Sequence, residues 1–377
     1  MKVLCVVGAR PNFMKAAPVI EALGKRSEMS IALVHTGQHY DRQMSELFFE
    51  QLGMPEPDLH LQVGSGSHGE QTGLIMLRLE SVLTEQRPDL VMVFGDVNST
   101  VAAALCAAKL GIKVAHVEAG LRSFDRTMPE ELNRILTDHL SDFLFTTEPS
   151  ARKNLLREGI AEERIFFVGN VMVDTLLKHR ERAKTLNMKE EFGLPPRPYG
   201  LLTLHRPSNV DNDDTLAGIL GAVQDLATEL PIVFPCHPRT RQQLEQSRFT
   251  HLLKAHEQSN SSQDGRLLVV EPLGYLEFLS LMTDARLVLT DSGGIQEETT
   301  VLGVPCLTLR NTTERPVTVT HGTNRVIGTA PARIVDEALW TLDHPPRPNG
   351  GPPLWDGRSS ERIVKILIGQ QGSKHHA

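Results

Sequence analysis

The chain has 377 residues, more than one ordinary hydrophobic core requires, and this length predicts two domains. Hydrophobic residues make up 40% and charged residues 23% of the chain, the usual balance of a globular protein. The net charge of −7 argues against a nucleic-acid-binding surface, so a site for an anionic ligand has to gather positive charge locally.

The first half of the chain alternates short apolar runs with helical patterns. Apolar, largely β-branched runs predict buried parallel strands at residues 3–7, 31–35, 90–94, 114–117, 143–146 and 165–168. Residues 12–25 and the alanine-rich residues 99–110 have the pattern of helices. This βαβα order predicts a doubly wound α/β domain.

The second half repeats this alternation. Strands are predicted at residues 199–204, 232–236, 267–271, 287–290 and 304–309, and helices at 215–230, 275–282 and 295–302. We therefore expect an α/β chain of two Rossmann-like domains, residues 1–169 and 170–355, with a C-terminal helix in residues 356–377 that crosses back to the first domain. Since open α/β sheets bind ligands beyond the carboxyl ends of their strands, the expected site is a cleft between the two domains.

The first candidate motif is Gly8-Ala9-Arg10-Pro11, directly after the first predicted strand. A dinucleotide-binding fold has GxGxxG at this place, so its absence disfavours a nicotinamide cofactor. Arg10 at the strand end and Lys15 about one helical turn later suit a phosphate, because both are cations beside a helix N-terminus. The alternative is that Arg10 and Lys15 are solvated surface cations.

The second candidate motif runs from Asp291 to Glu298, between a predicted strand and a predicted helix. The paired Gly293 and Gly294 let backbone N–H groups approach a ligand closely, and Ser292 adds a hydroxyl donor, which together predict a diphosphate cradle. Glu298 lies one turn further on, where its carboxylate can accept two ribose hydroxyls. The alternative is a simple helix start, since Asp and Ser are good caps.

A third candidate set is acidic. Asp96 and Glu118 each follow a predicted strand, and Glu130 and Glu131 follow Pro129 at a predicted helix start. Carboxylates from neighbouring strand ends and a nearby helix can converge, and the repulsion between like charges then makes one group an acid and another a base. The alternative for Glu130 is that it only complements a helix dipole.

Two histidines also follow predicted strands, His205 in His205-Arg206 and His237 in His237-Pro238-Arg239. An imidazole titrates near neutral pH and can donate a proton to a departing phosphate or sugar oxygen. Most of the other 13 of the chain's 15 histidines are better explained as structural. No HExxH motif occurs, so we expect no metal.

The cysteines and the N-terminal residues indicate the cellular compartment of the protein. Four cysteines are scattered through apolar segments without a CxxC pair, which favours reduced, buried thiols. The apolar run at residues 1–8 is too short for a membrane span or a signal core. We therefore expect a cytoplasmic protein that has no membrane or nucleic-acid partner.

Together the motifs resemble the non-hydrolysing UDP-N-acetylglucosamine 2-epimerases, over nearly the whole chain and in the same order. The resemblance implies a glycosyltransferase-B-type fold and a two-step reaction that uses no cofactor. UDP is eliminated anti across C1–C2 to give a 2-acetamidoglucal, and it then adds back to the opposite face, which inverts C2. The matching segments are Gly8-Ala9-Arg10-Pro11 with Lys15, Gly95-Asp96, His116 to Arg122, Pro129-Glu130-Glu131 with Asn133-Arg134, His205-Arg206, Asp291 to Glu298, and Thr312 to Pro316.

The resemblance also implies residue roles and a homodimer. Asp96, Glu118 and Glu130 would transfer protons, and His205 would assist at the departing UDP or the glucal. Gln38 and His39 match a region that holds a second substrate molecule, as an activator, in some bacterial members. The residues that would hold UDP are Arg10, Lys15, Arg134, His237, Ser292, Gly293, Gly294, Glu298 and Arg315.

Departures from the family pattern leave the sugar open. Ala9, Asn12 and Phe94 stand where Thr, Glu and His are common, and Val317 stands where Glu is common. The stretches after the Gln38-His39 pair and at residues 64–68 also differ, so activation by substrate is an open point. A 2-epimerase of a related UDP-2-acetamido sugar, such as a diacetamido uronic acid, is therefore an alternative.

Three other classes of protein share some of these features. A retaining glycosyltransferase would share the fold and the UDP cradle, but it would not need three carboxylates from the first domain. A hydrolysing epimerase would release free N-acetylmannosamine. A nucleotide-sugar sensor would be expected to lack Asp96, Glu118 or His205, and all three are present.

Overall fold

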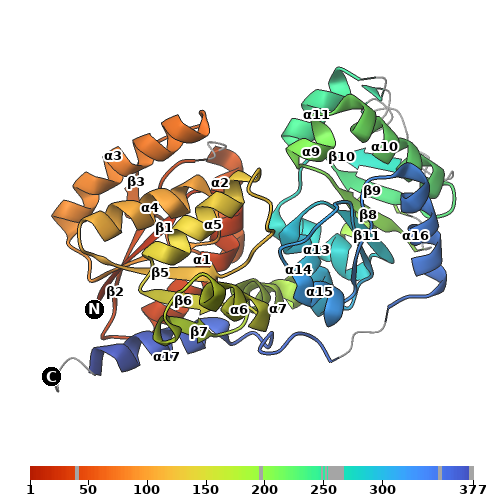
Figure 1. Ribbon diagram of the computed structural model, residues 1–377. Helices are drawn as coiled ribbons and strands as arrows, with labels where there is room; N and C mark the ends of the chain where they lie inside the picture. The colour runs from red at the N-terminus through yellow and green to blue at the C-terminus, as the bar shows by residue number, and fades with distance from the viewer. Residues whose placement is uncertain are drawn as a thin grey trace. The chain divides into compact units, whose positions relative to one another are not determined.

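A computed structural model describes residues 1–38, 42–194, 198–247, 249, 250, 253, 267–346 and 350–372. The chain divides into two compact units, the first made of Met1–Lys178 and Pro353–Ala377, and the second of His179–Pro352 (Figure 1). Sequence analysis predicted divisions at residues 169/170 and 355/356, which lie nine residues before the first of these limits and three residues after the second.

The first unit is built on one parallel sheet of seven strands in the order β3-β2-β1-β4-β5-β6-β7. The order means that the chain moves outward from β1 in one direction, returns, and continues from β4 in the other. The strands are β1 (Lys2–Val7), β2 (Ser30–His35), β3 (Leu59–His60), β4 (Leu90–Phe94), β5 (Lys113–Ala119), β6 (Phe143–Thr146) and β7 (Ile165–Phe167).

Helices cover both faces of this sheet. On one face, α4 (Asn98–Lys109) packs between α3 (His68–Gln86) and α5 (Pro129–Leu140), and α6 (Pro149–Arg157) follows β6 (Figure 1). On the other, α1 (Arg10–Gly24) packs against α2 (Arg42–Leu52) and the C-terminal α17 (Ser359–Gly372). A single turn of 3-10 helix, Glu162–Arg164, precedes β7, and α7 (Val171–Lys184) continues across the limit of the unit.

The C-terminal helix returns to the first unit through specific contacts. The carboxylate of Asp174 in α7 accepts hydrogen bonds from the backbone N–H groups of Ser359 and Ser360 at 3.1 and 2.7 Å. The indole of Trp355 donates to the carbonyl oxygen of Thr147 at 3.0 Å. The first turn of α17 is therefore capped by a side chain from a helix about 185 residues earlier in the chain.

The second unit has a parallel sheet of six strands in the order β10-β9-β8-β11-β12-β13. Its strands are β8 (Gly200–Thr203), β9 (Ile232–Pro235), β10 (Leu267–Val270), β11 (Leu287–Thr290), β12 (Cys306–Thr308) and β13 (Asn324–Val326). Its helices are α8 (Met188–Glu191), α9 (Pro207–Val210), α10 (Asp213–Ala227), α11 (Pro238–Glu245), α13 (Tyr275–Asp284), α14 (Gly293–Leu302), α15 (Pro316–Thr320) and α16 (Pro331–Asp343).

Each sheet has one point where the strand order reverses. In the first unit this switch point lies between β1 and β4, and in the second between β8 and β11. Loops diverge at such a point and leave a crevice outside the carboxyl ends of the two strands, where open α/β sheets bind ligands. The segments after β1, β4, β8 and β11 are thus the ones to examine for a site.

The structure confirms the predicted α/β class and most of the predicted elements. It adds two strands that sequence analysis missed, β3 and β13, because runs of two and three residues carry no periodicity. It also extends β5 beyond residue 117 to include Glu118 and Ala119. All four cysteines are buried and free, and none of the described helices is long and apolar enough to span a membrane.

Candidate active site

Two predicted site residues from different motifs, Lys15 and Glu118, meet at the switch point of the first unit. The Lys15 ammonium forms an ion pair with the Glu118 carboxylate, and both side chains are buried. Gly95, which follows β4, has a φ of +63°, and a Cβ there would lie 2.7 Å from Lys15 Nζ and 3.2 Å from Glu118 Oε2. A side chain at residue 95 would therefore disrupt the pair. Lys15 is not the solvated surface cation that was the alternative.

Asp96 follows Gly95 and is held by α5. Its carboxylate pairs with the buried guanidinium of Arg134, and its carbonyl oxygen accepts a hydrogen bond from Asn133 Nδ2 at 2.9 Å. Arg134 also binds Glu131 Oε2 through Nη2 at 2.6 Å. Although burial opposes ionisation, hydrogen bonds from the Ser123 amide and from Arg134 lower the pKa of Glu131. A cation thus accompanies both Asp96 and Glu118.

The other predicted site residues of the first unit are only partly described by the structure. Glu130 is half-buried in the first turn of α5, and its carboxylate has no hydrogen-bond or ion-pair partner within the described part of the chain. Gln38 is buried, and its Oε1 accepts hydrogen bonds from Ser99 N and Ser99 Oγ at 2.9 and 2.7 Å. His39 lies outside the described residues, as does the side chain of Arg10.

In the second unit, His205 lies at the switch point with a buried acid behind it. Its Nδ1 is 2.7 Å from Oδ1 of Asp291, the residue that follows β11. Asp291 also accepts hydrogen bonds from the backbone N–H groups of His205 and Arg206, both at 3.0 Å. Burial opposes ionisation, but His205 and these N–H groups lower the pKa of Asp291. Since Nδ1 faces a carboxylate, Nε2 of His205 is left for a ligand.

The helix α14 begins at Gly293 and carries the second predicted motif. Ser292 makes no capping hydrogen bond, and Asp291 is occupied by His205, so neither residue acts as a simple side-chain cap. Gly293 has no room for a side chain, because a Cβ would lie 2.4 Å from Arg315 Nη1 and 2.8 Å from Glu314 Oε1. The first turn of α14 is thus packed directly against a guanidinium.

That guanidinium belongs to a cluster that we call the arginine cluster: Arg206, Arg310 and Arg315 around Glu314. Arg310 Nη2 lies 2.8 Å from Glu314 Oε2, and Arg315 Nη1 lies 2.6 Å from Glu314 Oε1. Although Glu314 is buried, the three arginines hold its pKa well below the ordinary value. Arg315 Nε also pairs with Glu297 at 2.7 Å. Beside a helix N-terminus, such a concentration of cations favours an anionic ligand.

Glu298 is buried near the hydroxyl of Tyr275, which belongs to α13. Burial raises the pKa of Glu298 to about 8, with a smaller contribution from the charge of Glu297, while Tyr275 acts in the opposite sense. Burial also raises the pKa of Tyr275 well above its ordinary value. A carboxyl group with this pKa is largely protonated at neutral pH.

His237 is exposed at the N-terminus of α11, where its Nδ1 accepts a hydrogen bond from the Arg239 amide at 3.2 Å. The centroid of its ring lies 6.0 Å from that of His205. The structure thus brings together His205, His237 and Asp291 from the ends of β8, β9 and β11.

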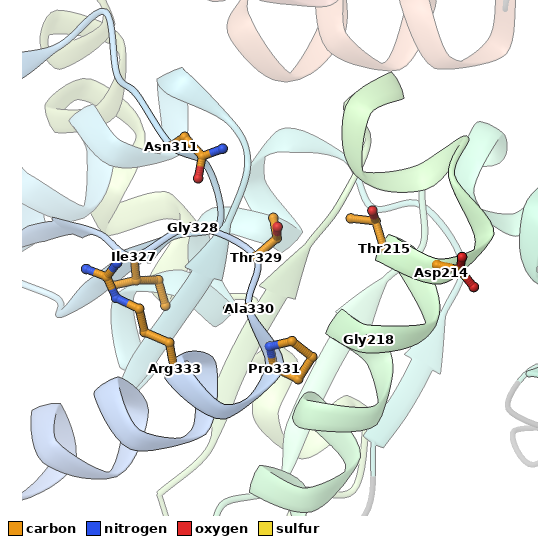
Figure 2. A pocket seen from close by; sticks show the side chains of 10 residues that line it. All are labelled: Asp214, Thr215, Gly218, Asn311, Ile327, Gly328, Thr329, Ala330, Pro331 and Arg333. Carbon is orange, nitrogen blue, oxygen red and sulfur yellow. The ribbon is translucent and has the colours of Figure 1, made fainter.

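A pocket of about 450 Å³ lies elsewhere in the second unit, between the first turns of α10 and α16. Figure 2 shows Asp214 and Arg333 at opposite sides of it, with Asn311 and Thr329 from the loops after β12 and β13. None of its lining residues belongs to the predicted site, and its charged side chains do not converge. We assign it no ligand.

Sequence analysis missed several residues that shape these groups. Asp291 was interpreted as part of a cradle or cap, whereas it is the partner of His205. Arg310 and Glu314 were given no separate role. Their closeness to Arg315 in the sequence is a signal for a cluster of ion pairs. Only the fold shows that Arg206, about 100 residues away, joins this cluster.

Comparisons with known proteins agree over almost the full length. A profile of the UDP-N-acetylglucosamine 2-epimerase family matches residues 21–368. The chain is 45% identical to a UDP-N-acetylglucosamine 2-epimerase of Methanocaldococcus jannaschii, with 97% of this chain and 99% of that protein covered. It is 42% identical to a UDP-2,3-diacetamido-2,3-dideoxy-D-glucuronate 2-epimerase of Pseudomonas aeruginosa, with the same coverage.

Solved structures give the same result. The fold is similar to that of the M. jannaschii UDP-GlcNAc 2-epimerase in complex with UDP-GlcNAc and UDP, with a TM-score of 0.88, 45% identity, and coverage of 98% of this chain and 99% of that one. It is also similar to the Neisseria meningitidis UDP-GlcNAc 2-epimerase bound to UDP-GlcNAc, with a TM-score of 0.87, 32% identity and coverage of 98% and 100%.

Proposed function

The chain belongs to the UDP-N-acetylglucosamine 2-epimerase family, and we propose that it interconverts UDP-N-acetylglucosamine and UDP-N-acetylmannosamine without hydrolysing the link to UDP. One observation carries the proposal. Acids and a lysine gather at the switch point of the first sheet, and a histidine, a helix N-terminus and arginines gather at that of the second. The first group suits proton transfer at a sugar, and the second suits a diphosphate.

The proposed reaction has two steps that balance without an added cofactor. In the first, the C1–O bond breaks and its electron pair leaves with UDP, while a carboxylate takes the C2 proton and a C1=C2 double bond forms. In the second, UDP adds back to C1 and a proton is delivered to the opposite face of C2. The sugar is inverted at C2 and no net proton is consumed.

The first-unit acids are suited to this chemistry by their partners. If C1–O cleavage runs ahead of proton removal, positive charge develops on the sugar ring, and nearby carboxylates stabilise it. Lys15 and Arg134, which remain proposed UDP ligands, form ion pairs with Glu118 and Asp96. Glu130, with no such partner among the described residues, is the carboxylate best placed to exchange a proton.

The second-unit residues are assigned to UDP. Arg315, Ser292, Gly293 and Gly294 would bind the diphosphate, since a guanidinium and helix N-terminal amides are strong donors to phosphate oxygens. Nε2 of His205 would donate to the leaving oxygen, with Asp291 fixing the imidazole. Glu298 would accept the ribose hydroxyls. His237 and Arg10 remain proposed UDP ligands.

A second candidate substrate is a UDP-2,3-diacetamido uronic acid. The P. aeruginosa enzyme named for that substrate is 42% identical to this chain, almost the same as the 45% of the M. jannaschii enzyme. Overall identity therefore does not separate the two sugars. A uronate would need an additional cation beside C5, which gives the comparison of substrates a physical basis.

Location and assembly are further parts of the proposal. Four buried, free cysteines suit a reducing compartment, and we assign the protein to the cytoplasm. We also propose a homodimer. In support, the helical layer α3–α4–α5 carries exposed leucines, with Leu77 at 67% and Leu136 at 54% exposure.

The function is tested by proton NMR of the purified protein with UDP-N-acetylglucosamine in D₂O. We expect a mixture with UDP-N-acetylmannosamine and entry of deuterium at C2. Release of free N-acetylmannosamine would instead identify a hydrolysing epimerase. An unchanged sugar would rule out the first substrate, and the diacetamido uronate and then glycosyl acceptors would be tested next.

The acid assignment predicts that Asp96→Asn and Glu118→Gln abolish turnover while UDP still binds. Each change removes a charge but keeps the size of the side chain, and neither residue belongs to the second-unit group. Turnover is measured by NMR and UDP affinity by calorimetry. Full activity in either variant would remove that residue from the proton-transfer set.

A further inference from the structure

His116, in β5, is fully buried and makes hydrogen bonds through both ring nitrogens. Its Nε2 lies 2.8 Å from the carbonyl oxygen of Gly95, and its Nδ1 lies 2.7 Å from Oδ1 of Asp138 in α5. A carbonyl oxygen can only accept, so Nε2 carries a proton. The Gly95 carbonyl belongs to the residue directly before Asp96, and His116 thereby holds the turn from which Asp96 projects.

Asp138 binds the backbone on the other side of Glu118. Its second oxygen, Oδ2, accepts a hydrogen bond from the Gly120 amide at 3.1 Å and lies 2.7 Å from Arg122 Nη1. Its two oxygens therefore hold the residues two before and two after Glu118. One buried carboxylate brackets the segment that carries a proposed catalytic acid.

The bracketed backbone needs this support because its conformation is unfavourable. Glu118 has a φ of +77°, in the left-handed region where a residue with a Cβ is strained. The pairing of β5 with β6 also shifts register between Val117 and Ala119. Without fixed neighbours, this bulge would relax and Glu118 would turn away from Lys15.

Gly95 and Glu118 are also joined to one another. The Gly95 amide donates to the carbonyl oxygen of Val117 at 3.0 Å, and Gly95 itself has a φ of +63°. The chain of contacts from Asp138 through His116 to Gly95 thus reaches the backbone of both Asp96 and Glu118. Gly95 and Glu118, both with a left-handed backbone, lie within this chain of contacts.

We propose that Asp138 and His116 form a buried carboxylate–imidazolium pair that acts as the positioning device for Asp96 and Glu118. The proposal rests on the proposed epimerase function. Nε2 carries a proton because it donates to the Gly95 carbonyl oxygen. An ionised Asp138 can also only accept a hydrogen bond, so Nδ1 must carry a second proton. Within the described part of the chain, Arg122, itself paired with Glu158 at 2.7 and 2.8 Å, is the other charged group that faces Asp138. Despite burial, His116 and Arg122 lower the pKa of Asp138.

Asp138→Asn tests the positioning role. The amide N–H group faces either His116, which must then give up its Nδ1 proton to accept a hydrogen bond, or the Gly120 amide, where two donors repel one another. In either arrangement the charged pair with His116 or the hydrogen bond to Gly120 is lost. We expect kcat to fall roughly 10- to 100-fold, the scale of a misplaced catalytic group, with KM and UDP affinity within about two-fold of the unaltered protein. Asp138→Glu, which keeps the carboxylate, should recover part of kcat.

Asp174→Asn is the matched control. Asp174 is also a buried acid of the first unit that accepts two backbone hydrogen bonds, but it caps α17 and touches no proposed catalytic residue. It should lower thermal stability as much as Asp138→Asn does and leave kcat unchanged. Equal kcat in Asp138→Asn and Asp174→Asn would overturn the positioning role.

A measurement that does not depend on turnover tests the ion pair. The protein is labelled with nitrogen-15 in its histidine rings, and the His116 signals are identified by their loss in His116→Gln. We expect nitrogen shifts of an imidazolium, with protons on both ring nitrogens. A neutral His116 in the unaltered protein would overturn the pair, whether or not Asp138→Asn folds.

The two proposals fail in different ways. Absence of turnover by the unaltered protein would contradict the epimerase function and the positioning role together, while the nitrogen signals would still decide the ion pair. Turnover by the unaltered protein, with normal kcat in folded His116→Gln and Asp138→Asn, would contradict only the positioning role.

Discussion

At the scale of single residues, Gly293 makes room for Arg315. A Cβ at residue 293 would lie 2.4 Å from Arg315 Nη1, and Arg315 cannot easily move because Glu297 and Glu314 hold it. We expect Gly293→Ala to weaken UDP binding about 10- to 100-fold, the loss of one or two charge-assisted hydrogen bonds. Calorimetric titration with UDP measures the change.

Gly221 offers the control for this prediction. It lies in α10, and a Cβ there would meet nothing within 4 Å. Gly221→Ala should leave UDP affinity unchanged and stabilise the helix by roughly 0.5–1 kcal/mol. Equal UDP affinity in Gly293→Ala and Gly221→Ala would show that Arg315 does not contribute to UDP binding.

Glu298 makes a prediction about stability and pH. Its pKa is raised to about 8 in the folded chain by burial, from an ordinary value of 4.5. As the pH rises from about 4.5 to 8, the unfolded chain releases this proton and the folded chain keeps it, so the free energy of unfolding falls by up to about 1.4 kcal/mol per pH unit. The contribution of Glu298 to the free energy of unfolding is therefore fully present below about pH 4.5 and is lost as the pH rises to about 8.

Glu298→Gln removes the carboxyl group that takes up and releases this proton. In urea unfolding without UDP, we expect the variant to exceed the unaltered protein in stability at pH 8, by on the order of a few kcal/mol, and the difference to vanish near pH 5. A stability difference that is the same at pH 5 and pH 8 would contradict the raised pKa.

At the scale of elements, α5 is inverted relative to an ordinary amphipathic helix. Its buried face carries the charged Glu131, Arg134 and Asp138, while Leu132 and Leu136 are exposed. Burying charge is costly unless each group is paired, and here Asp96, His116, Arg122 and backbone amides supply the partners. The helix thereby places ionisable groups beside the two strand ends that carry the proposed catalytic acids.

The helix α17 makes the opposite contribution, which is purely to stability. Its Ile363, Val364 and Leu367 are buried, and the helix packs on α1, which begins just after β1. We expect Ile363→Ala to lower the free energy of unfolding by about 2–4 kcal/mol, as for other large-to-small core changes. Chemical denaturation measures it, and the exposed Lys365→Ala serves as the control. A loss below 0.5 kcal/mol would show that α17 contributes little.

At the scale of the whole molecule, the proposed dimer predicts that a charge on the α3–α4–α5 layer separates the subunits. Leu77 in α3 is 67% exposed and lies on a helix without proposed site residues. We expect Leu77→Glu to sediment as a monomer at micromolar concentration, since an unpaired carboxylate would be buried at the interface. Leu339→Glu, on the exposed side of α16 in the second unit, should remain dimeric. A dimeric Leu77→Glu would exclude this surface.

The sequence by itself determined the strands other than β3 and β13, a minority of the helices and the places where site residues begin. Buried parallel strands leave continuous apolar runs, and the residues after them, such as Asp96, His205 and Asp291, lie at sheet edges by geometry alone. Only the tertiary structure decided which groups meet. Lys15 and Glu118 are 103 residues apart, and Asp291 is 86 residues from His205. Their pairing depends on strand order, helix packing and one left-handed backbone residue, which leave no periodic signal in the chain.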